Sequence, residues 1–168
     1  MKPNAAPPLK LRIDMIPTTS WGISLRNSIP RSQWDKLRKE VHQKNNLKCE
    51  ICGSPEKLNC HEHWEYDDET NTQRLTSLGT VCNMCHHVAH IGRSKQLAAQ
   101  GHLDIQAVVN HFLAINSCDL KAFRRHEKEA LELWAIRSDT QWKVDFGEYA
   151  ALVRTDATLD STSKCNFV

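Results

Sequence analysis

Hydrophobic residues recur three and four positions apart in three stretches of the chain, which is the spacing of one face of an α-helix. In the first stretch, Trp34, Leu37 and Val41 share such a face. The preceding segment 32–35, Ser-Gln-Trp-Asp, resembles a capping box, in which a short polar side chain caps the first turn of a helix. The pattern therefore predicts an amphipathic helix over residues 32–45.

Two further apolar stripes lie in the C-terminal half of the chain. Asp104 and Asp119 precede them, and aspartate is a favourable residue at the N-terminus of a helix. The stripes consist of Ile105, Val108, Val109, Phe112 and Leu113, and of Leu120, Phe123, Ala130, Leu131 and Trp134. They predict two amphipathic helices whose apolar faces belong to the core. Apolar and polar residues alternate in 141–146, which predicts a short strand.

A β-hairpin is expected in the middle of the chain. Segments 58–65 and 75–81 flank the polar stretch 67–72, whose composition is typical of a turn. After the hairpin, the pattern predicts a helix that continues past Gly92 and stops at Gly101. Strands and helices are thus segregated along the chain, and the predicted fold class is α+β.

The predicted elements divide the chain into four segments. Residues 1–30 are expected to form a partly extended N-terminal segment, and residues 31–101 a central module with its leading helix. Residues 102–150 are expected to form a helical segment that packs on the module. The end of the chain, 151–168, is rich in Ser, Thr and Asp, which predicts a flexible tail.

Composition places the chain in a broad class of proteins. With 168 residues, 40% hydrophobic and 25% charged, it fits one globular domain with short appendages. Its apolar runs are shorter than the roughly 20 residues of a membrane span, so no membrane association is expected. The first ten residues lack the apolar core of a secretory signal, and a cytoplasmic location is therefore expected.

The net charge of +2 is too small to indicate a partner by itself, but basic residues cluster between Arg26 and Lys48. Four of these basic residues lie in the predicted first helix or directly before it, and they are candidate contacts for nucleic-acid phosphates. These are Arg31, Lys36, Arg38 and Lys39. The alternative interpretation is a solvated helix face with no ligand.

Four of the seven cysteines fall into two identical pairs, Cys49 with Cys52 and Cys82 with Cys85. Two residues between thiolates allow a tight turn to direct both sulfur atoms at one ion, and two such turns complete a tetrahedral zinc site. A structural Zn²⁺ is therefore predicted. The remaining residues, Cys60, Cys118 and Cys165, lack partners at ligand spacing and are interpreted as core or tail residues.

Histidines surround this predicted zinc site. His61 and His63 lie in the first strand of the hairpin, while His86 and His90 follow the second cysteine pair at a spacing of four, which places both on one helix face. If the hairpin folds against the helix, His61 joins His86 and His90 around a second, open metal site. The alternative is that these histidines are outer groups of the zinc module or surface residues.

These residues carry a resemblance to a known family. Cys-x-x-Cys-Gly at 49–53, Leu-x-Cys-His-Glu at 58–62 and Val-Cys-x-x-Cys-His at 81–86 resemble the HNH endonuclease pattern, in which zinc knuckles staple a ββα, treble-clef-like nuclease module. The stretches His-Glu-x-Trp-x-Tyr-Asp at 61–67 and Cys-His-x-x-x-His-x-Gly at 85–92 are similar to those of a small bacterial HNH-like group. The resemblance extends over about residues 11–146 and implies helices on both sides of the module.

The resemblance also implies roles for individual residues. His61 and His86, with His90, correspond to ligands of a catalytic Mg²⁺, Mn²⁺, Ni²⁺ or Zn²⁺ ion. Glu62 stands at the position of the general base, with His63 as the alternative. Ser77 stands where the family usually has an asparagine that orients the base.

The predicted function is metal-dependent hydrolysis of phosphodiester bonds in DNA by an HNH-type nuclease. Two alternatives use the same residues. In one, a catalytically inactive zinc module binds nucleic acid or a protein partner. In the other, all seven ligands hold two structural zinc ions. Metal stoichiometry distinguishes these alternatives, because a structural zinc is held tightly and a catalytic ion exchanges.

Overall fold

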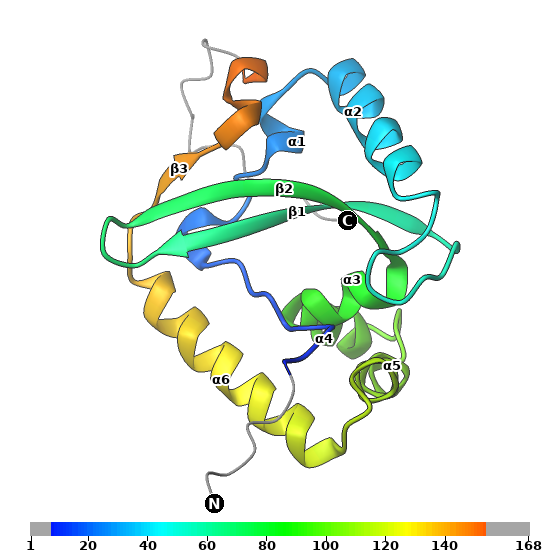
Figure 1. Cartoon of the computed structure of the whole chain (residues 1–168). Helices are drawn as coiled ribbons and strands as arrows, with labels where there is room; N and C mark the ends of the chain where they lie inside the picture. The colour runs from blue at the N-terminus through cyan, green and yellow to red at the C-terminus, as the bar shows by residue number, and fades with distance from the viewer. Residues whose placement is uncertain (1–7, 154–168) are drawn as a thin grey trace, which may run out of the picture.

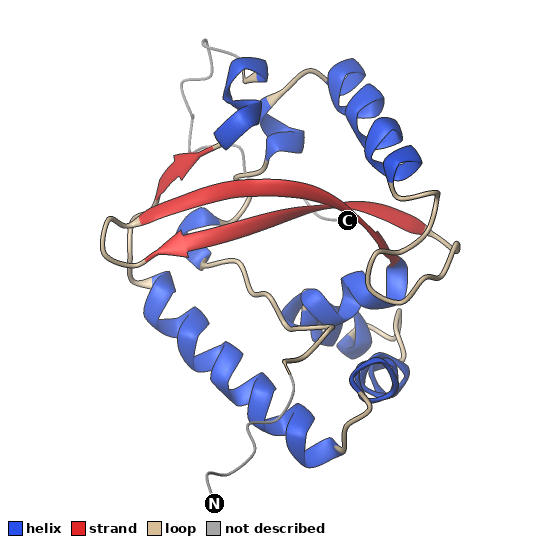
Figure 2. Ribbon diagram, in the orientation of Figure 1, coloured by secondary structure: helices blue, strands red, loops and turns tan. Residues whose placement is uncertain are grey.

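A long β-hairpin is the central element of the structure, a computed structural model that describes residues 8–153 (Figures 1 and 2). The elements in chain order are α1 (Leu25–Ser28), α2 (Arg31–Lys44), β1 (Leu58–Asp67), β2 (Thr72–Cys82), α3 (Asn83–Ala89), α4 (Ile91–Ala99), α5 (Ile105–Asn116), α6 (Leu120–Ser138) and β3 (Lys143–Asp145). Two 3₁₀-helices, η1 (Thr18–Ser20) and η2 (Gly147–Leu152), flank the helices and the sheet. The predicted α+β class is confirmed.

The hairpin is antiparallel and pairs Leu58 with Cys82 at one end and Asp67 with Thr72 at the other. Asp67 closes the turn, since its carboxylate accepts the backbone N–H groups of Glu69 at 3.0 Å and Thr70 at 3.1 Å. The strands are longer than the predicted segments because pairing continues through the polar residues next to the turn. β3 adds a short parallel strand to β2, giving the order β1-β2-β3.

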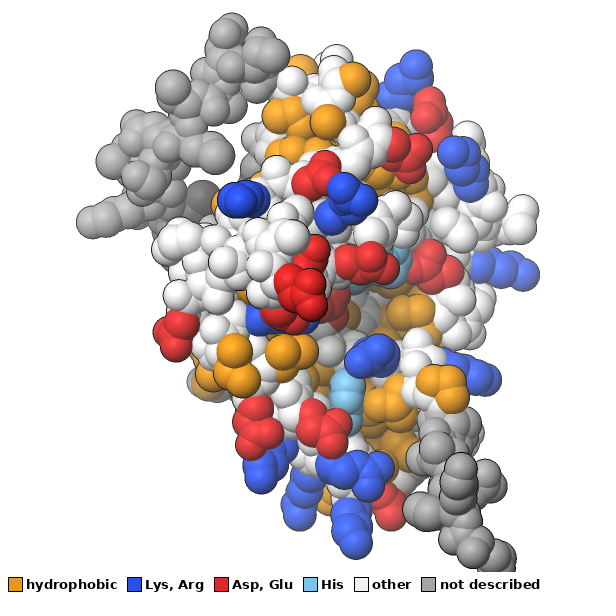
Figure 3. Space-filling view, turned by 60° about the vertical axis from the view of Figure 1, so that its left-hand side comes forward, with side chains coloured by type: hydrophobic (Ala, Val, Ile, Leu, Met, Phe, Trp, Pro, Cys, Tyr) orange, Lys and Arg blue, Asp and Glu red, His pale blue; other side chains and the backbone are white. Residues whose placement is uncertain are grey.

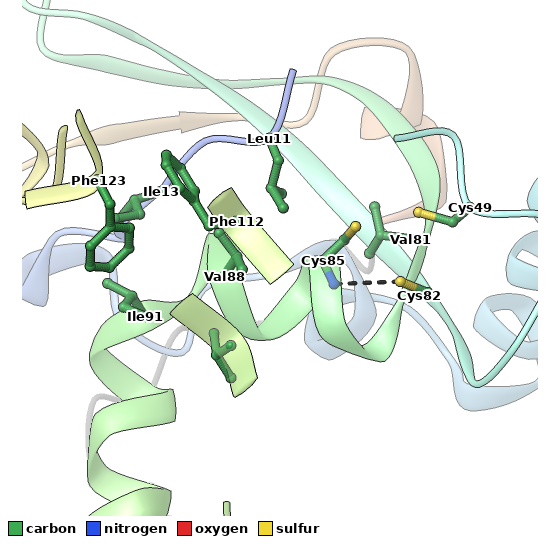
Figure 4. Close-up of a cluster of buried hydrophobic side chains, with 11 residues drawn as sticks. Leu11, Ile13, Cys49, Val81, Cys82, Cys85, Val88, Ile91, Phe112 and Phe123 are labelled. Atoms are coloured by element: carbon green, nitrogen blue, oxygen red, sulfur yellow. Dashed lines mark hydrogen bonds between the residues drawn. The ribbon is translucent and has the colours of Figure 1, made fainter. Parts of the chain in front are cut away.

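The hairpin separates α2 from the four helices α3 to α6, as Figure 1 shows. A hydrophobic cluster lies on each side of it. The larger contains Val88, Phe112 and Phe123 and joins α3, α5 and α6 (Figure 4). The smaller contains Trp34 and Leu75 and joins α2 to the sheet. Removing such side chains from water contributes about 1.5–3 kcal/mol each, so both faces of the hairpin are anchored.

Residues 8–17 form no helix or strand but are held against the helices by specific contacts. The backbone N–H of Ile13 donates to Nε2 of His126 at 2.9 Å, and that of Asp14 donates to the carbonyl of Ala89 at 2.9 Å. The indole N–H of Trp134 donates to the carbonyl of Ile16 at 3.0 Å. This segment therefore belongs to the fold and approaches the end of α3.

The predicted continuous helix after the hairpin is wrong, because α3 ends at Ala89 and α4 begins at Ile91. Between them, His90 has φ −101° and ψ 51°, which is outside the helical region. A carbonyl inside a helix accepts the N–H four residues later, whereas the carbonyl of Ala89 accepts Asp14 from the N-terminal segment. The predicted stop is confirmed, since Gly101 has φ +76° and follows the C-cap of α4.

The start of α2 also differs from the prediction. Pro30 is its N-cap residue, the helix begins at Arg31, and no side chain caps it, so Ser32 lies inside the first turn. Proline has a fixed φ that suits a helix start without a capping side chain. By contrast, Asp104 and Asp119 cap α5 and α6 through their carboxylates, as predicted. The predicted tail lies almost wholly outside the described residues.

Candidate metal centres

The four paired cysteines come together at one end of the hairpin. Cys49 and Cys52 lie in a tight turn after α2, in which the N–H of Gly53 donates to the carbonyl of Cys49 at 2.8 Å and Gly53 adopts φ +77°. Cys82 is the last residue of β2, and its sulfur accepts the N–H of Cys85 in the first turn of α3 at 3.5 Å. Figure 4 shows the sulfur atoms of Cys49, Cys82 and Cys85 facing the same space.

The sulfur atoms have the spacing that a tetrahedral ion requires. All four lie within 4.8 Å of one another, and those of Cys52 and Cys82 are 3.5 Å apart. Zinc with Zn–S distances of about 2.3 Å places its sulfur ligands about 3.8 Å apart. Burial raises the pKa of Cys52 to about 11, and a bound dication favours the thiolate instead. The cluster therefore fits a structural zinc ion.

His111 is a neighbour of this cluster that the sequence did not indicate. It lies on α5, and its Nε2 atom is 3.2 Å from the sulfur of Cys85. With the sulfur as thiolate, His111 donates and Cys85 accepts, which places a hydrogen bond in the outer shell of the ion. The histidine is separated from the cysteine pairs by a helix, so sequence spacing carries no signal for this contact.

Three imidazoles form a second cluster next to the first. His61 comes from β1, His86 from α3 and His90 from the junction of α3 and α4, and their nitrogen donors lie within 4.8 Å of one another. Their ring centroids are 4.6 to 5.6 Å apart. The structure therefore brings together the three predicted ligands of a second ion, although the helix that carries two of them is interrupted.

Burial keeps these imidazoles neutral. It lowers the pKa of His61 to about 2 and that of His86 to about 4, and it lowers the pKa of His90 as well. A neutral imidazole has a free lone pair, which is the form that binds a transition-metal ion. The side chain of His61 is the most enclosed, since the residue is only 6% exposed.

His63 lies beside the histidine cluster and has a carboxylate partner. Its ring centroid is 5.0 Å from that of His61, and its Nε2 atom is 2.8 Å from Oε1 of Glu50. This hydrogen bond raises the pKa of His63, while burial opposes the shift. The pair lies over Gly79, where an added Cβ would approach Glu50 and the imidazole to less than 3 Å. Glycine at this position therefore leaves room for the pair.

Glu62 lines the cavity of about 170 Å³ together with the three histidines, but its carboxylate is bound to the start of α1. Its two carboxylate oxygens accept the backbone N–H groups of Leu25 at 3.0 Å and Arg26 at 3.1 Å, at the start of α1. Burial raises the pKa of Glu62, and these two hydrogen bonds oppose the shift. Along a strand successive side chains alternate between faces, so Glu62 and His61 point to opposite faces of β1.

Asp14 is a second residue that the sequence did not indicate. The contact of its backbone with Ala89 places it beside His90, and it lines two cavities of about 430 and 170 Å³ together with His61. Burial raises the pKa of Asp14, and the neighbouring His90 and His63 oppose this shift only in their protonated forms. The cluster of neutral histidines thus has a carboxyl group close to it.

The predicted phosphate-binding residues of α2 divide into two groups. Arg31 and Arg38 line a cavity of about 550 Å³ whose wall also includes His86 of the histidine cluster. Lys36 and Lys39 are exposed and do not line it. Elsewhere charges are mixed, and Figure 3 shows acidic and basic side chains interspersed on the face that carries the hairpin turn. The arginines of this cavity therefore share its lining with one histidine of the cluster, His86.

Two further residues of the hairpin lie near the predicted site or its strand. Ser77 lies directly opposite His63 in the strand register, but the His63 ring makes its hydrogen bond to the carboxylate of Glu50. Trp64 packs on Phe146 at 5.8 Å between ring centroids, so its role is packing.

Within residues 8–153, no helix is both long and apolar enough to cross a membrane. Comparisons with protein-family models, curated proteins and solved structures find no match to this chain.

Proposed function

We propose that the protein is a metal-dependent nuclease of the HNH type, which hydrolyses phosphodiester bonds in DNA. The observation that carries the proposal is the convergence of His61, His86 and His90 on one point beside a four-cysteine cluster. A hairpin followed directly by α3 also supports a ββα module of the treble-clef-like kind, because it presents a strand histidine to a helix face.

In this proposal the two clusters have different tasks. The four cysteines hold a structural zinc ion that joins the turn after α2 to the end of β2. The three histidines hold a second divalent ion, Mg²⁺, Mn²⁺, Ni²⁺ or Zn²⁺, and the cysteine site takes no part in the reaction. When bound at the histidines, a divalent ion would supply Lewis acidity for a phosphate oxygen and for the departing 3′ oxygen.

The contacts favour His63 over Glu62 as the general base. With its Nε2–H donating to Glu50, a neutral His63 carries its lone pair on Nδ1 and can accept a proton from water. The resulting hydroxide attacks phosphorus, and the bond from phosphorus to the 3′ oxygen breaks. Glu50 holds the imidazole in position, which is the task of the asparagine that Ser77 replaces. Glu62 instead anchors α1 through two backbone hydrogen bonds.

Substitution of the two candidate bases gives different expected results. His63→Ala should lower the cleavage rate by about 10²–10⁴-fold, the contribution of a positioned general base, without loss of the structural zinc. Glu62→Gln should retain most of the rate but lower the free energy of unfolding by about 1–3 kcal/mol, because one backbone N–H loses its charged acceptor. Single-turnover cleavage and urea denaturation measure the two effects. The reverse pattern, an active His63→Ala and an inactive, fully stable Glu62→Gln, would assign the base to Glu62.

One observation favours a second candidate function. Because His61 is almost fully buried, the histidine cluster also suits an ion that serves only to stabilise the fold. The protein would then be a catalytically inactive zinc module that binds nucleic acid or a protein partner. A structural ion of this kind is held as tightly as the ion at the cysteines and does not exchange.

The experiment that tests the proposal is cleavage of supercoiled plasmid and of single-stranded DNA by the zinc-loaded protein. Mg²⁺, Mn²⁺, Ni²⁺ and additional Zn²⁺ are offered in turn, and bound metal is counted in parallel. Cleavage that requires a weakly bound second ion supports the nuclease. Two tightly held zinc ions and no cleavage with any ion would support the structural module.

A further inference from the structure

A cavity of about 550 Å³ lies between α1, α2 and the hairpin. Three arginines line it, Arg26 from α1 and Arg31 and Arg38 from α2, and the only carboxylate in its lining is that of Asp35. A concave site with an excess of guanidinium groups attracts anions, because the protein walls focus the field of the cations. We call it the arginine cavity.

Asp35 contacts two of the arginines. Its Oδ1 atom accepts the Nε–H of Arg38 at 2.8 Å, and its Oδ2 atom lies 3.8 Å from Nε of Arg31. The three residues are spaced along one face of α2, but the Arg31 side chain is 94% exposed, so the carboxylate restrains only the Arg38 guanidinium at the cavity. A guanidinium bonded at Nε still has its terminal N–H groups free for a planar, bidentate contact with phosphate.

The arginine cavity is continuous with the histidine cluster. His86 belongs to the lining of the arginine cavity and to that of the smaller cavity of about 170 Å³ that contains His61 and His90. Arg26 also lines both cavities. Its backbone N–H binds Glu62, which fixes the start of α1 against β1 and so places the Arg26 side chain at the junction.

We propose that the arginine cavity binds phosphate groups of the DNA strand next to the one at the histidine cluster, with Arg26 at the junction and Arg31 and Arg38 further along. This inference rests on the proposed function for the identity of the strand. The DNA strand would then contact cations on α1 and α2, outside the hairpin and α3, before it reaches the metal centre.

The test is the salt dependence of DNA binding, measured by fluorescence anisotropy with a labelled duplex and its single strand. All variants carry His61→Ala, which disrupts the histidine cluster and leaves the lining of the arginine cavity intact, so the probe is not consumed. Neutralising a residue that contacts a phosphate should reduce the slope of log K against log salt concentration by about 0.9 for a duplex and about 0.7 for a single strand. Arg26→Gln and Arg38→Gln should each show this reduction on at least one of the two probes.

Lys44→Gln is the matched control, because Lys44 is an exposed cation on α2 that does not line the cavity. For this variant, the slope of log K against log salt concentration should equal that of the protein with His61→Ala alone. Arg26→Gln keeps the backbone N–H that binds Glu62, so its result does not depend on a change in fold. Unchanged slopes in both arginine variants would overturn the proposal. Reduced slopes in Lys36→Gln and Lys39→Gln alone would place the DNA on the exposed face of α2 and overturn it equally.

The two proposals fail in different ways. If the otherwise unmodified protein cleaves no DNA with any ion but the arginine variants lose slope, the arginine cavity stands as a binding site and the nuclease proposal fails. If cleavage occurs but the arginine variants bind with the parent slope, the nuclease proposal stands and the strand enters by another route.

Discussion

Replacing His61 with alanine is expected to abolish metal-dependent cleavage while the four-cysteine zinc site and the fold are retained. His61 is the only one of the three clustered imidazoles that comes from β1, and the other two come from α3 and its end. Without it, the remaining pair holds the ion from one side only, and an incompletely held ion is lost by exchange. His86→Ala should have the same effect, because it removes the donor that also faces the arginine cavity.

His87→Ala is the matched control for these variants. It follows His86 directly in α3, but its ring contacts Ser94 and Asn83, at 3.1 and 3.2 Å, and lies outside the cluster. This variant should cleave plasmid at the rate of the parent per folded molecule. Plasmid nicking, bound zinc and thermal denaturation are measured for all three variants. Cleavage that persists in His61→Ala and His86→Ala alike would assign the activity to another site or to a contaminant.

Replacing Cys49 or Cys82 with serine is expected to unfold the central module. Zinc binding in small cysteine sites contributes about 10–16 kcal/mol to folding. The whole free energy of unfolding of a domain is about 5–15 kcal/mol. If the removal of one ligand releases the ion, the binding free energy that is lost is therefore comparable with the total stability. Because Cys49 and Cys82 are buried, a serine hydroxyl in their place is also removed from water without the metal bond that the thiolate makes. In both serine variants, the far-ultraviolet circular dichroism signal and the amount of bound zinc should fall.

Cys118→Ser provides the control for this experiment, since Cys118 is half-buried near the start of α6 and takes no part in the cluster. It should bind zinc and melt like the parent protein. Parent-like zinc content and melting temperature in Cys49→Ser would exclude the four-cysteine assignment. Removal of the ion with a chelator should reproduce the effect of the serine variants and should be reversed by added zinc.

Much of the local structure follows from the sequence because its causes are local. The polar stretch between two short segments predicts the hairpin, helical periodicity predicts the long helices, and aspartate side chains cap α5 and α6 where expected. The paired cysteine spacings predict the four-sulfur cluster, since the turn that brings two sulfurs together lies within each motif. The spacing of four predicts that His86 and His90 lie on one helix face. His61 is expected to join them if the hairpin folds against that helix.

Only the tertiary structure decides which groups lie next to these residues. The alternation of side chains along β1 predicts that His61 and Glu62 point to opposite faces. It does not predict that the Glu62 carboxylate accepts backbone N–H groups of α1, or that Glu50 contacts His63 over Gly79. Such contacts join residues from different elements, and their spacing along the chain is arbitrary.

The same distinction applies to the helix break and to the arginines. Helical periodicity predicts one continuous helix through His90. In the structure, the carbonyl of Ala89 at the end of α3 instead accepts a hydrogen bond from the backbone N–H of Asp14, which is distant in the sequence. Charge counting places four basic residues at the start of α2 and along it. The packing of α2 on the sheet places the half-buried Arg38 and the exposed Arg31 in the lining of the arginine cavity, whereas Lys36 and Lys39 are exposed and lie outside it. Side-chain direction in a helix is fixed by the face that is buried, and the partner that buries it is known only from the fold.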